Sequence, residues 1–401
     1  MRSVPKSIAI VRRAGVSAFL PFLAALACRL DGETVDPPAF SVPPLVRQME
    51  IRSLARWGDE IVVETDRSGI NYRNEIASRP WFWRLTPGTR ALSRLDPGGG
   101  RRFLGFSAGP SDRFGVALNG RELELLAFDA SSPAGRRLCV VGESSQPLRV
   151  WVATLGRFIC VIGPDQVTVV ADNKVVGELP LARVVGPDTD RLLWLPGSVR
   201  AVAATRQEIF LGLEVGEFGG GAYAFSLTDS GRLHAARKVW SEHVSAIAAQ
   251  GDDVVWMAGG GGGMGSISGS LVREHAGQLD VIVHQAIMIG RESPVASHPI
   301  LRLPQATTMD GLALDADNRV IVAATQLGLI SYRSGDGLKI LWPKPLIPAQ
   351  ADPNHAYEGQ PVSLVLHGDS LFLATRFLGV LEFARTPSGF EFRGQITIPT
   401  D

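Results

Sequence analysis

Short runs of apolar residues, separated by tight polar turns, recur from about residue 45 to the end of the chain. Each unit opens with one apolar run, passes through a short turn, and continues with a second run richer in β-branched residues. Seven such units begin at Leu54, Phe103, Trp151, Ala201, Ser245, Leu312 and Ser363. Helical periodicity over about ten residues is absent beyond the first 27 positions. The pattern therefore predicts an all-β chain.

The turns inside these units have the chemistry of β-hairpins. Three units join their two runs through the same pair of residues, at Gly58-Asp59, Gly251-Asp252 and Gly368-Asp369. Glycine adopts the positive φ that a two-residue hairpin requires, and the Asp side chain bonds to nearby backbone. We therefore expect each pair of runs to form an antiparallel hairpin.

The spacing of the units indicates how the hairpins assemble. Their first residues are separated by 49, 48, 50, 44, 67 and 51 positions. Further strand-like runs follow in the last two units, at residues 327–333, 338–342, 379–383 and 390–396. Repeats of this length with four strands are typical of β-propellers, in which sheets stacked around an axis bury both of their apolar faces. We predict a single β-propeller of seven four-stranded blades over residues 45–401.

One unit also resembles a known repeat. The segment Gly311–Trp342, with Asp317-Asn318 in its first turn and the motif Ala-Thr-x-x-Gly-Leu after its second run, resembles the bacterial propellers of two-component-regulator sensors and NHL-type proteins. The resemblance implies a seven-bladed β-propeller and implies no catalytic residue. Residues 101–200 fit the repeat least well, so two smaller β domains divided near Pro187–Gly197 remain an alternative.

The first 27 residues are typical of a secretory signal peptide. Residues 1–13 carry four basic residues and no acid, and a mostly apolar, uncharged run extends from Ala14 to Ala27. A run of this length is too short to cross a bilayer as a helix. Cys28, directly after Ala25-Leu26-Ala27, resembles the lipidated cysteine of bacterial lipoproteins.

A tether follows this segment. Residues 28–44 contain two Pro-Pro pairs and little periodicity, which indicates an extended linker. We therefore expect a protein exported to the periplasm or outer membrane and attached to the membrane only through a lipid on Cys28. A plain signal peptide whose cleavage site precedes a cysteine is the alternative.

The charge balance limits the possible partners. The chain has 40 basic and 40 acidic residues and a formal net charge of zero, which argues against a broad nucleic-acid-binding surface. Of the basic residues 35 are Arg, and we attribute this excess to composition rather than to function.

The remaining two cysteines lie in strand-like runs. Cys139 and Cys160 form either a disulfide or two buried free thiols, because sequence does not give the distance between them. No Cys or His spacing typical of a zinc site is present in the sequence.

Candidate ligand-binding residues lie where the repeat is interrupted. Insertions follow the second run in units four and five, and a longer surplus falls at residues 284–308. In propellers the loop between the second and third strands lies, by fold analogy, on the face where ligands bind. The glycines could expose backbone amides and the two Glu could meet a cation, or the glycines simply permit wide bends. The candidates are Glu214, Glu217, Gly219, Gly220, Gly221, Gly260 and Gly262.

Three further candidates stand near predicted blade entrances. Asp310, His355 and Glu358 could line the axial opening of the propeller, or they could be solvated loop residues. No pattern in the sequence identifies a cofactor or a metal.

Two functions are consistent with this sequence, which lacks the motifs of α/β-hydrolases, nucleotide-binding loops and zinc proteases. The favoured one is a monomeric, non-catalytic scaffold that binds a protein, peptide or glycan at its loop face. The alternative is a metal-dependent hydrolase, lyase or lactonase with its site at the axial opening. Three or more converging carboxylate, Asn or His side chains would favour the enzyme, and an opening lined by Gly, Leu and Arg would favour the scaffold.

Overall fold

Seven antiparallel sheets follow one another along the chain in the computed structural model, and each is built from consecutive strands. We number these sheets blades 1 to 7. The structure describes residues 49–66, 80–107, 113–129, 132–144, 149–185, 199–214, 220–260, 262–263, 266–288, 291–292, 307–325, 327–342 and 360–399.

The first four blades have four strands each. Blade 1 comprises β1 (Glu50–Trp57), β2 (Glu60–Asp66), β3 (Pro80–Thr86) and β4 (Ala91–Arg94). Blade 2 comprises β5 (Arg102–Phe106), β6 (Phe114–Asn119), β7 (Glu122–Asp129) and β8 (Ser132–Glu143). Blade 3 comprises β9 (Trp151–Leu155), β10 (Phe158–Ile162), β11 (Gln166–Ala171) and β12 (Lys174–Pro180), followed by the helix α2 (Leu181–Val185). Blade 4 comprises β13 (Val199–Ala204), β14 (Ile209–Glu214), β15 (Gly220–Leu227) and β16 (Leu233–Trp240).

The last three blades continue the same order. Blade 5 comprises β17 (Ala246–Gln250), β18 (Val254–Gly259), β20 (Ser266–His275) and β21 (Gln278–Met288), with the short strands β19 (Gly262–Gly263) and β22 (Arg291–Glu292) added. Blade 6 comprises β23 (Met309–Leu314), β24 (Val320–Ala324), β25 (Gly328–Arg333) and β26 (Gly337–Trp342). Blade 7 comprises β27 (Pro361–His367), β28 (Ser370–Thr375), β29 (Gly379–Thr386) and β30 (Gly389–Ile396).

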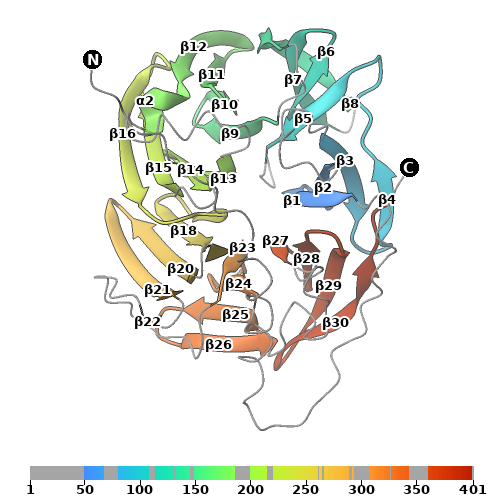
Figure 1. The fold of residues 1–401 in the computed structure, drawn as a ribbon. Helices are drawn as coiled ribbons and strands as arrows, with labels where there is room; N and C mark the ends of the chain where they lie inside the picture. The colour runs from blue at the N-terminus through green and yellow to red at the C-terminus, as the bar shows by residue number, and fades with distance from the viewer. Residues whose placement is uncertain are drawn as a thin grey trace, which may run out of the picture.

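The blades are arranged in a ring (Figure 1). The first strand of each blade lies towards the centre, as β1, β9, β13 and β27 show, and the fourth strand lies at the outside, as β16, β26 and β30 show. The prediction of an all-β propeller with seven four-stranded blades is confirmed.

Every boundary between blades is filled by its own hydrophobic core. Seven buried clusters each combine residues of two adjacent blades, including blades 7 and 1. Side chains alternate along each strand, so one sheet serves two cores. On β10, for example, Ile159 and Val161 belong to the core shared with blade 2, whereas Phe158, Cys160 and Ile162 belong to the core shared with blade 4.

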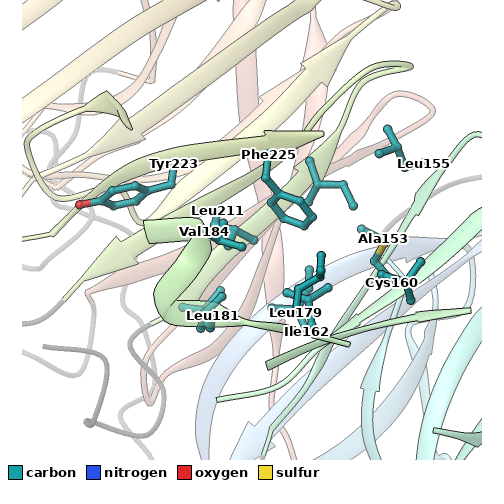
Figure 2. Packing of buried hydrophobic residues seen from close by; sticks show 14 of the residues in the cluster. Ala153, Leu155, Cys160, Ile162, Leu179, Leu181, Val184, Leu211, Tyr223 and Phe225 are labelled. Atoms are coloured by element: carbon teal, nitrogen blue, oxygen red, sulfur yellow. The ribbon is translucent and has the colours of Figure 1, made fainter. Parts of the chain in front are cut away.

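The core between blades 3 and 4 excludes the two-domain alternative. Figure 2 shows Cys160 and Ile162 from blade 3 packed beside Leu211 and Phe225 from blade 4. The helix α2 adds Leu181 to the same cluster. The proposed division near residues 187–197 falls between these two blades. Because the blades share one continuous core, that alternative is wrong.

The ring closes by packing rather than by exchange of a strand. Each blade uses strands from one continuous stretch of chain, so blade 7 receives no strand from the N-terminal end of the described chain. The backbone N–H of Ile51 donates to the carbonyl of Arg376 at 2.8 Å, and the Arg376 Nε–Glu50 Oε1 distance is 2.6 Å. Arg90, in the turn between β3 and β4, places its Nε 2.5 Å from Oε2 of Glu382 on β29. These contacts add to the apolar core between blades 7 and 1.

The predicted hairpin turns are confirmed. Gly58, Gly251 and Gly368 have φ of 65°, 65° and 57°, in the left-handed region that glycine adopts without strain. Asn318 takes the same role in blade 6, with φ of 60°. Asn tolerates this conformation better than most residues do.

Two of the predicted insertions are shorter than expected. Gly220 and Gly221 belong to strand β15, where they pair with Glu214 and Leu213, so they are not loop residues. Part of the surplus expected from residue 284 extends the outer strand β21 to Met288, because β20 pairs with it along its full length, from Ser266 opposite Met288 to His275 opposite Gln278.

Candidate functional site

The seven innermost strands enclose a cavity on the axis of the ring, with a volume of about 130 Å³. Every blade contributes to its wall through its first strand or the residues beside it. The lining includes Arg52, Ser53, Leu54, Gly105, Phe106, Arg149, Val150, Arg200, Ala201, Ser245, Ile247, Leu312, Ser363 and Leu364. We call the end of the axis where the first strands begin the mouth.

Three guanidinium groups stand at this end of the cavity. Arg52 is the third residue of β1, Arg200 is the second residue of β13, and Arg149 stands two residues before β9. Glu64, on β2, is the one carboxylate among the described residues that line the cavity. The charged lining therefore carries three positive charges and one negative charge.

Glu64 neutralises one of the three. The Arg149 Nη2–Glu64 Oε2 distance is 2.6 Å, and the hydroxyl of Ser53 donates to the same oxygen at 2.6 Å. Burial lowers the pKa of Arg149; the Glu64 carboxylate opposes this shift, and the positive charges of Arg200 and Arg52 reinforce it.

Stacking holds Arg149 in place. Its guanidinium carbon lies 3.9 Å from the centroid of the Trp151 ring, within the range of a cation–π contact. The indole N–H of Trp151 donates to the carbonyl of Val199 at 3.2 Å, which ties the ring to blade 4. Blades 1, 3 and 4 thus fix this side chain together.

Arg52 also belongs to a network of ion pairs. Arg52 Nη2 is 3.1 Å from Glu50 Oε2 and 3.5 Å from Asp66 Oδ2. Glu50 also bonds Arg376 of blade 7. This group links the first and last blades at the mouth.

Asp310 lies beside the cavity without lining it, and it is buried at 7% exposure. The hydroxyl of Ser245, which lines the cavity, lies 3.3 Å from Asp310 Oδ1 and 3.2 Å from the carbonyl oxygen of Met309. The contact joins blade 5 to blade 6. Asp310 is therefore a junction residue rather than part of the lining.

At the glycine candidates in blades 4 and 5, the protein's own backbone occupies the space that a side chain would need. A Cβ on Gly220 would overlap the carbonyl of Leu213 and lie 3.1 Å from the Cα of His243. A Cβ on Gly221 would lie 2.7 Å from the carbonyl of Trp240, and one on Gly260 would overlap the carbonyl of Ser268. At these positions glycine permits close backbone packing, so the structural interpretation holds for them.

The other candidates contribute less. Glu214 ends β14 and pairs with Gly220, and Gly262 pairs with Ile267. The predictions for Glu217, Gly219, His355, Glu358 and the lipidation site Cys28 lie outside the described residues.

Cys139 and Cys160 are both free thiols. Cys139 lies on β8 and packs in the core between blades 2 and 3, whereas Cys160 packs in the core between blades 3 and 4. The sheet of blade 3 separates them, so a disulfide does not form. Burial raises the pKa of Cys160 to about 12 and also raises the pKa of Cys139.

Within the described part of the chain, no three His, Cys, Asp or Glu side chains come together as ligands of a metal would. The described residues also contain no apolar helix of the length needed to span a bilayer.

A second hollow lies at the opposite end of the ring, between the turns of blades 3 and 4, with a volume of about 640 Å³. Three of its charged side chains, Arg157, Arg206 and Glu208, already have partners. Arg157 Nη2 donates to the carbonyl of Asp229 at 2.5 Å, and Glu208 accepts from both Nε and Nη2 of Arg237 at 3.1 and 2.6 Å. The axial cavity, to which all seven blades contribute, is the stronger candidate site.

The axial arginines were missed in the sequence, although a signal for them exists. Arg52 and Arg149 each stand two positions before the first residue of a predicted unit, and Arg200 stands one position before. Aligning the units on their first strands would have placed the three side chains at one end of the axis.

The fold defines the protein as a seven-bladed β-propeller. No protein-family model and no curated protein sequence matches the chain.

Among solved structures, the chain is similar to the β-propeller domain of Cps50 (Swd1) from Myceliophteria thermophila, with 12% identity and a TM-score of 0.48 over 84% of this chain and 97% of that one. It is also similar to the WD40 β-propeller domain of Doa1, with 9% identity and a TM-score of 0.46 over 85% and 95% of the two chains. It is similar as well to the β-propeller domain of the trilobed protease from Pyrococcus furiosus, with 8% identity and a TM-score of 0.44 over 88% of this chain and 96% of that one. Likenesses at this level carry no information about ligand or activity.

Proposed function

We propose that this protein is an exported, lipid-anchored β-propeller of the cell envelope that binds a protein, peptide or glycan at the mouth of its axis, without catalysis. The observation that carries the proposal is the axial cavity, into which all seven first strands direct residues. Such a convergence concentrates side chains from distant parts of the chain at one accessible point.

The composition of the lining favours binding over hydrolysis. Arg, Leu and Gly are present among the lining residues, and their only carboxylate in the described part of the chain, Glu64, is engaged by Arg149 and Ser53. A hydrolase of the metal-dependent type would need several oxygen or nitrogen ligands directed at one point. The lining matches the arrangement expected of a scaffold.

The export and anchoring part of the proposal rests on the sequence of residues 1–28, which lie outside the described residues. Fractionation of cells that produce the full chain, followed by mass spectrometry of its N-terminus, tests it. We expect the protein in the membrane fraction with a lipid-modified Cys28 at its N-terminus. A soluble, unmodified protein that lacks residues 1–28 would contradict anchoring.

The binding part is tested by blocking the mouth. Ser363 lines the cavity, and Ser363→Trp places an indole there; Ser388→Trp makes the same change on an exposed turn of the same blade. We expect a cross-linked partner from an envelope extract to be captured by the wild type and by the Ser388→Trp control, and to be lost with Ser363→Trp. Equal capture by both variants would place the binding surface elsewhere.

A further inference from the structure

The hollow between the turns of blades 3 and 4 has the size of a small-molecule site. Its volume is about 640 Å³, and ligand pockets commonly have volumes of about 300–1,000 Å³. The residues that line it lie well inside the continuously described stretches 149–185, 199–214 and 220–260. Both of its walls are therefore part of the described structure.

Apolar side chains make up part of the lining. Leu155 and Phe158 are buried in the core between blades 3 and 4, and half-buried Leu227 packs against the same core. Ala235, on β16, is exposed and lines the hollow from blade 4. An apolar group of a ligand would be removed from water against this surface, which favours its binding.

Four Arg, Asp or Glu side chains line the hollow, and two of them are neutralised by residues outside the lining. Arg206 Nε lies 2.7 Å from Asp252 Oδ1. Glu208 accepts two hydrogen bonds from Arg237, at 3.1 and 2.6 Å. These two charges therefore need no partner on a ligand.

Arg157 and Asp229 are the other two, and neither forms an ion pair with any described residue. Arg157 Nη2 donates to the backbone carbonyl of Asp229 at 2.5 Å, which is a neutral acceptor. This bond crosses from blade 3 to blade 4 and brings the two residues together. The hollow therefore presents one cation and one anion close to each other.

Both groups are held by the surrounding structure. The guanidinium carbon of Arg157 lies 5.2 Å from the centroid of the Phe158 ring, in addition to its bond across the blades. The turn that carries Asp229 is closed by hydrogen bonds from the N–H of Gly231 to the carbonyl of Thr228 at 2.9 Å, and from the N–H of Arg232 to the hydroxyl of Thr228 at 3.2 Å. Groups held in this way lose little conformational freedom when a ligand binds.

A direct ion pair between the two side chains would contribute little, because both are exposed. A ligand that engages both charges therefore loses little by keeping them apart. Such a ligand must itself carry an anion and a cation close together. A free α-amino acid carries both on one carbon atom, whereas a residue inside a peptide carries neither.

We propose that this hollow binds a free α-amino acid with an apolar side chain. The α-carboxylate accepts from the Arg157 guanidinium, whose Nε and Nη1 bond no acceptor among the described residues. The α-ammonium donates to the Asp229 carboxylate, and the side chain lies against Leu155 and Phe158. The site is at the end of the ring opposite the mouth, and it does not rest on the function proposed there.

Titration calorimetry of the full chain with L-leucine, N-acetyl-L-leucine and L-leucinamide tests the proposal. The second compound lacks the ammonium group, and the third lacks the carboxylate. We expect saturable binding of leucine, weakened about 10- to 100-fold by either block, since each block removes one charge-assisted hydrogen bond. In Asp229→Asn, leucine should bind no more tightly than N-acetyl-leucine, because the partner of the ammonium group is gone.

A substitution that fills the hollow provides a second test. Ala235→Trp places an indole in the hollow and should abolish leucine binding. Ala236→Trp is the matched control, since Ala236 is the next residue of β16, is equally exposed, and faces the other side of the strand, outside the lining. It should leave leucine binding unchanged. Thermal unfolding of each variant confirms that it is folded.

Three results would overturn the inference: no saturable binding of leucine, equal loss of binding with the two tryptophan variants, or leucinamide binding as tightly as leucine. The last result would indicate the N-terminus of a peptide instead of a free amino acid. The outcome is separable from that of the proposed function, because Ser363→Trp at the mouth should leave leucine binding unchanged.

Discussion

Replacing Phe372 with Ala tests how the ring closes. Phe372 lies on β28, is fully buried, and packs in the core between blades 7 and 1. A buried aromatic side chain removes about 150 Å² or more from water. At about 25 cal/mol per Å² this corresponds to about 4 kcal/mol, within the range of about 3–5 kcal/mol for Phe→Ala in cores. We expect a loss of this size because no strand among the described residues is shared between blades 7 and 1.

Urea unfolding followed by tryptophan fluorescence measures the effect. Phe225→Ala is the matched control, since Phe225 is equally buried between blades 3 and 4, which follow one another in the chain. If the ring is closed, the two substitutions lower the free energy of unfolding by similar amounts, within about 1 kcal/mol. Both variants then unfold in one transition, because every blade has two neighbours.

The reasoning fails if Phe372→Ala costs less than about 1 kcal/mol while Phe225→Ala shows its full effect. Such a result would mean that blades 7 and 1 are not packed together in solution. A separate early transition of the terminal blades would lead to the same conclusion.

Three further predictions concern the interior. Gly269→Ala would place a Cβ against the backbone carbonyl oxygen of Thr307, and it should lower the free energy of unfolding in urea by about 1–3 kcal/mol. Gly88→Ala, where a Cβ meets open space, should leave that free energy unchanged. Cys160 should resist alkylation in the native state at pH 8, because a pKa of about 12 leaves almost no thiolate, and the reaction at half-buried Cys139 should quicken as pH rises. Peptide mapping identifies the site, and equal labelling before and after denaturation would contradict burial. Arg149→Met should lower the free energy of unfolding in urea by about 3 kcal/mol, because it leaves the buried carboxylate of Glu64 without its cation. Replacing Glu64 with Gln in the same protein should restore part of the loss.

The first two strands of every blade can be predicted from sequence because their signals are local. In four blades a glycine with positive φ joins the first two strands, at Gly58, Gly156, Gly251 and Gly368, and the two runs pair across it. In the irregular region 101–200, Gly156 supplies this signal for blade 3, and Phe103 and Trp151 lie on the first strands of blades 2 and 3 as predicted.

The roles of the glycines in blades 4 and 5 could not be predicted in the same way. A glycine that opens a loop and a glycine that allows two backbones to approach look alike in sequence. The distinction at Gly220 depends on the carbonyl of Leu213, which the pairing of β14 with β15 brings close, and on His243, which lies beside Gly220 once blade 5 is packed on blade 4. Likewise, the arginines of the axis are brought together by the ring, and no local pattern shows that Arg52 lies near Arg149.

The arginines of this protein therefore occupy two kinds of site, which shift the pKa of the guanidinium in opposite directions. At a junction between blades 4 and 5, Arg237 bonds Glu208 and Glu274, and its pKa is raised, chiefly by the hydrogen bond to Glu208. At the axis, Arg149 meets one carboxylate and two cations, and burial with those cations lowers its pKa. The junction cation is held by two anions, whereas the axial cation meets one anion and two cations. Arg237→Met should therefore lower the free energy of unfolding in urea, because it leaves the buried carboxylate of Glu274 without its cation.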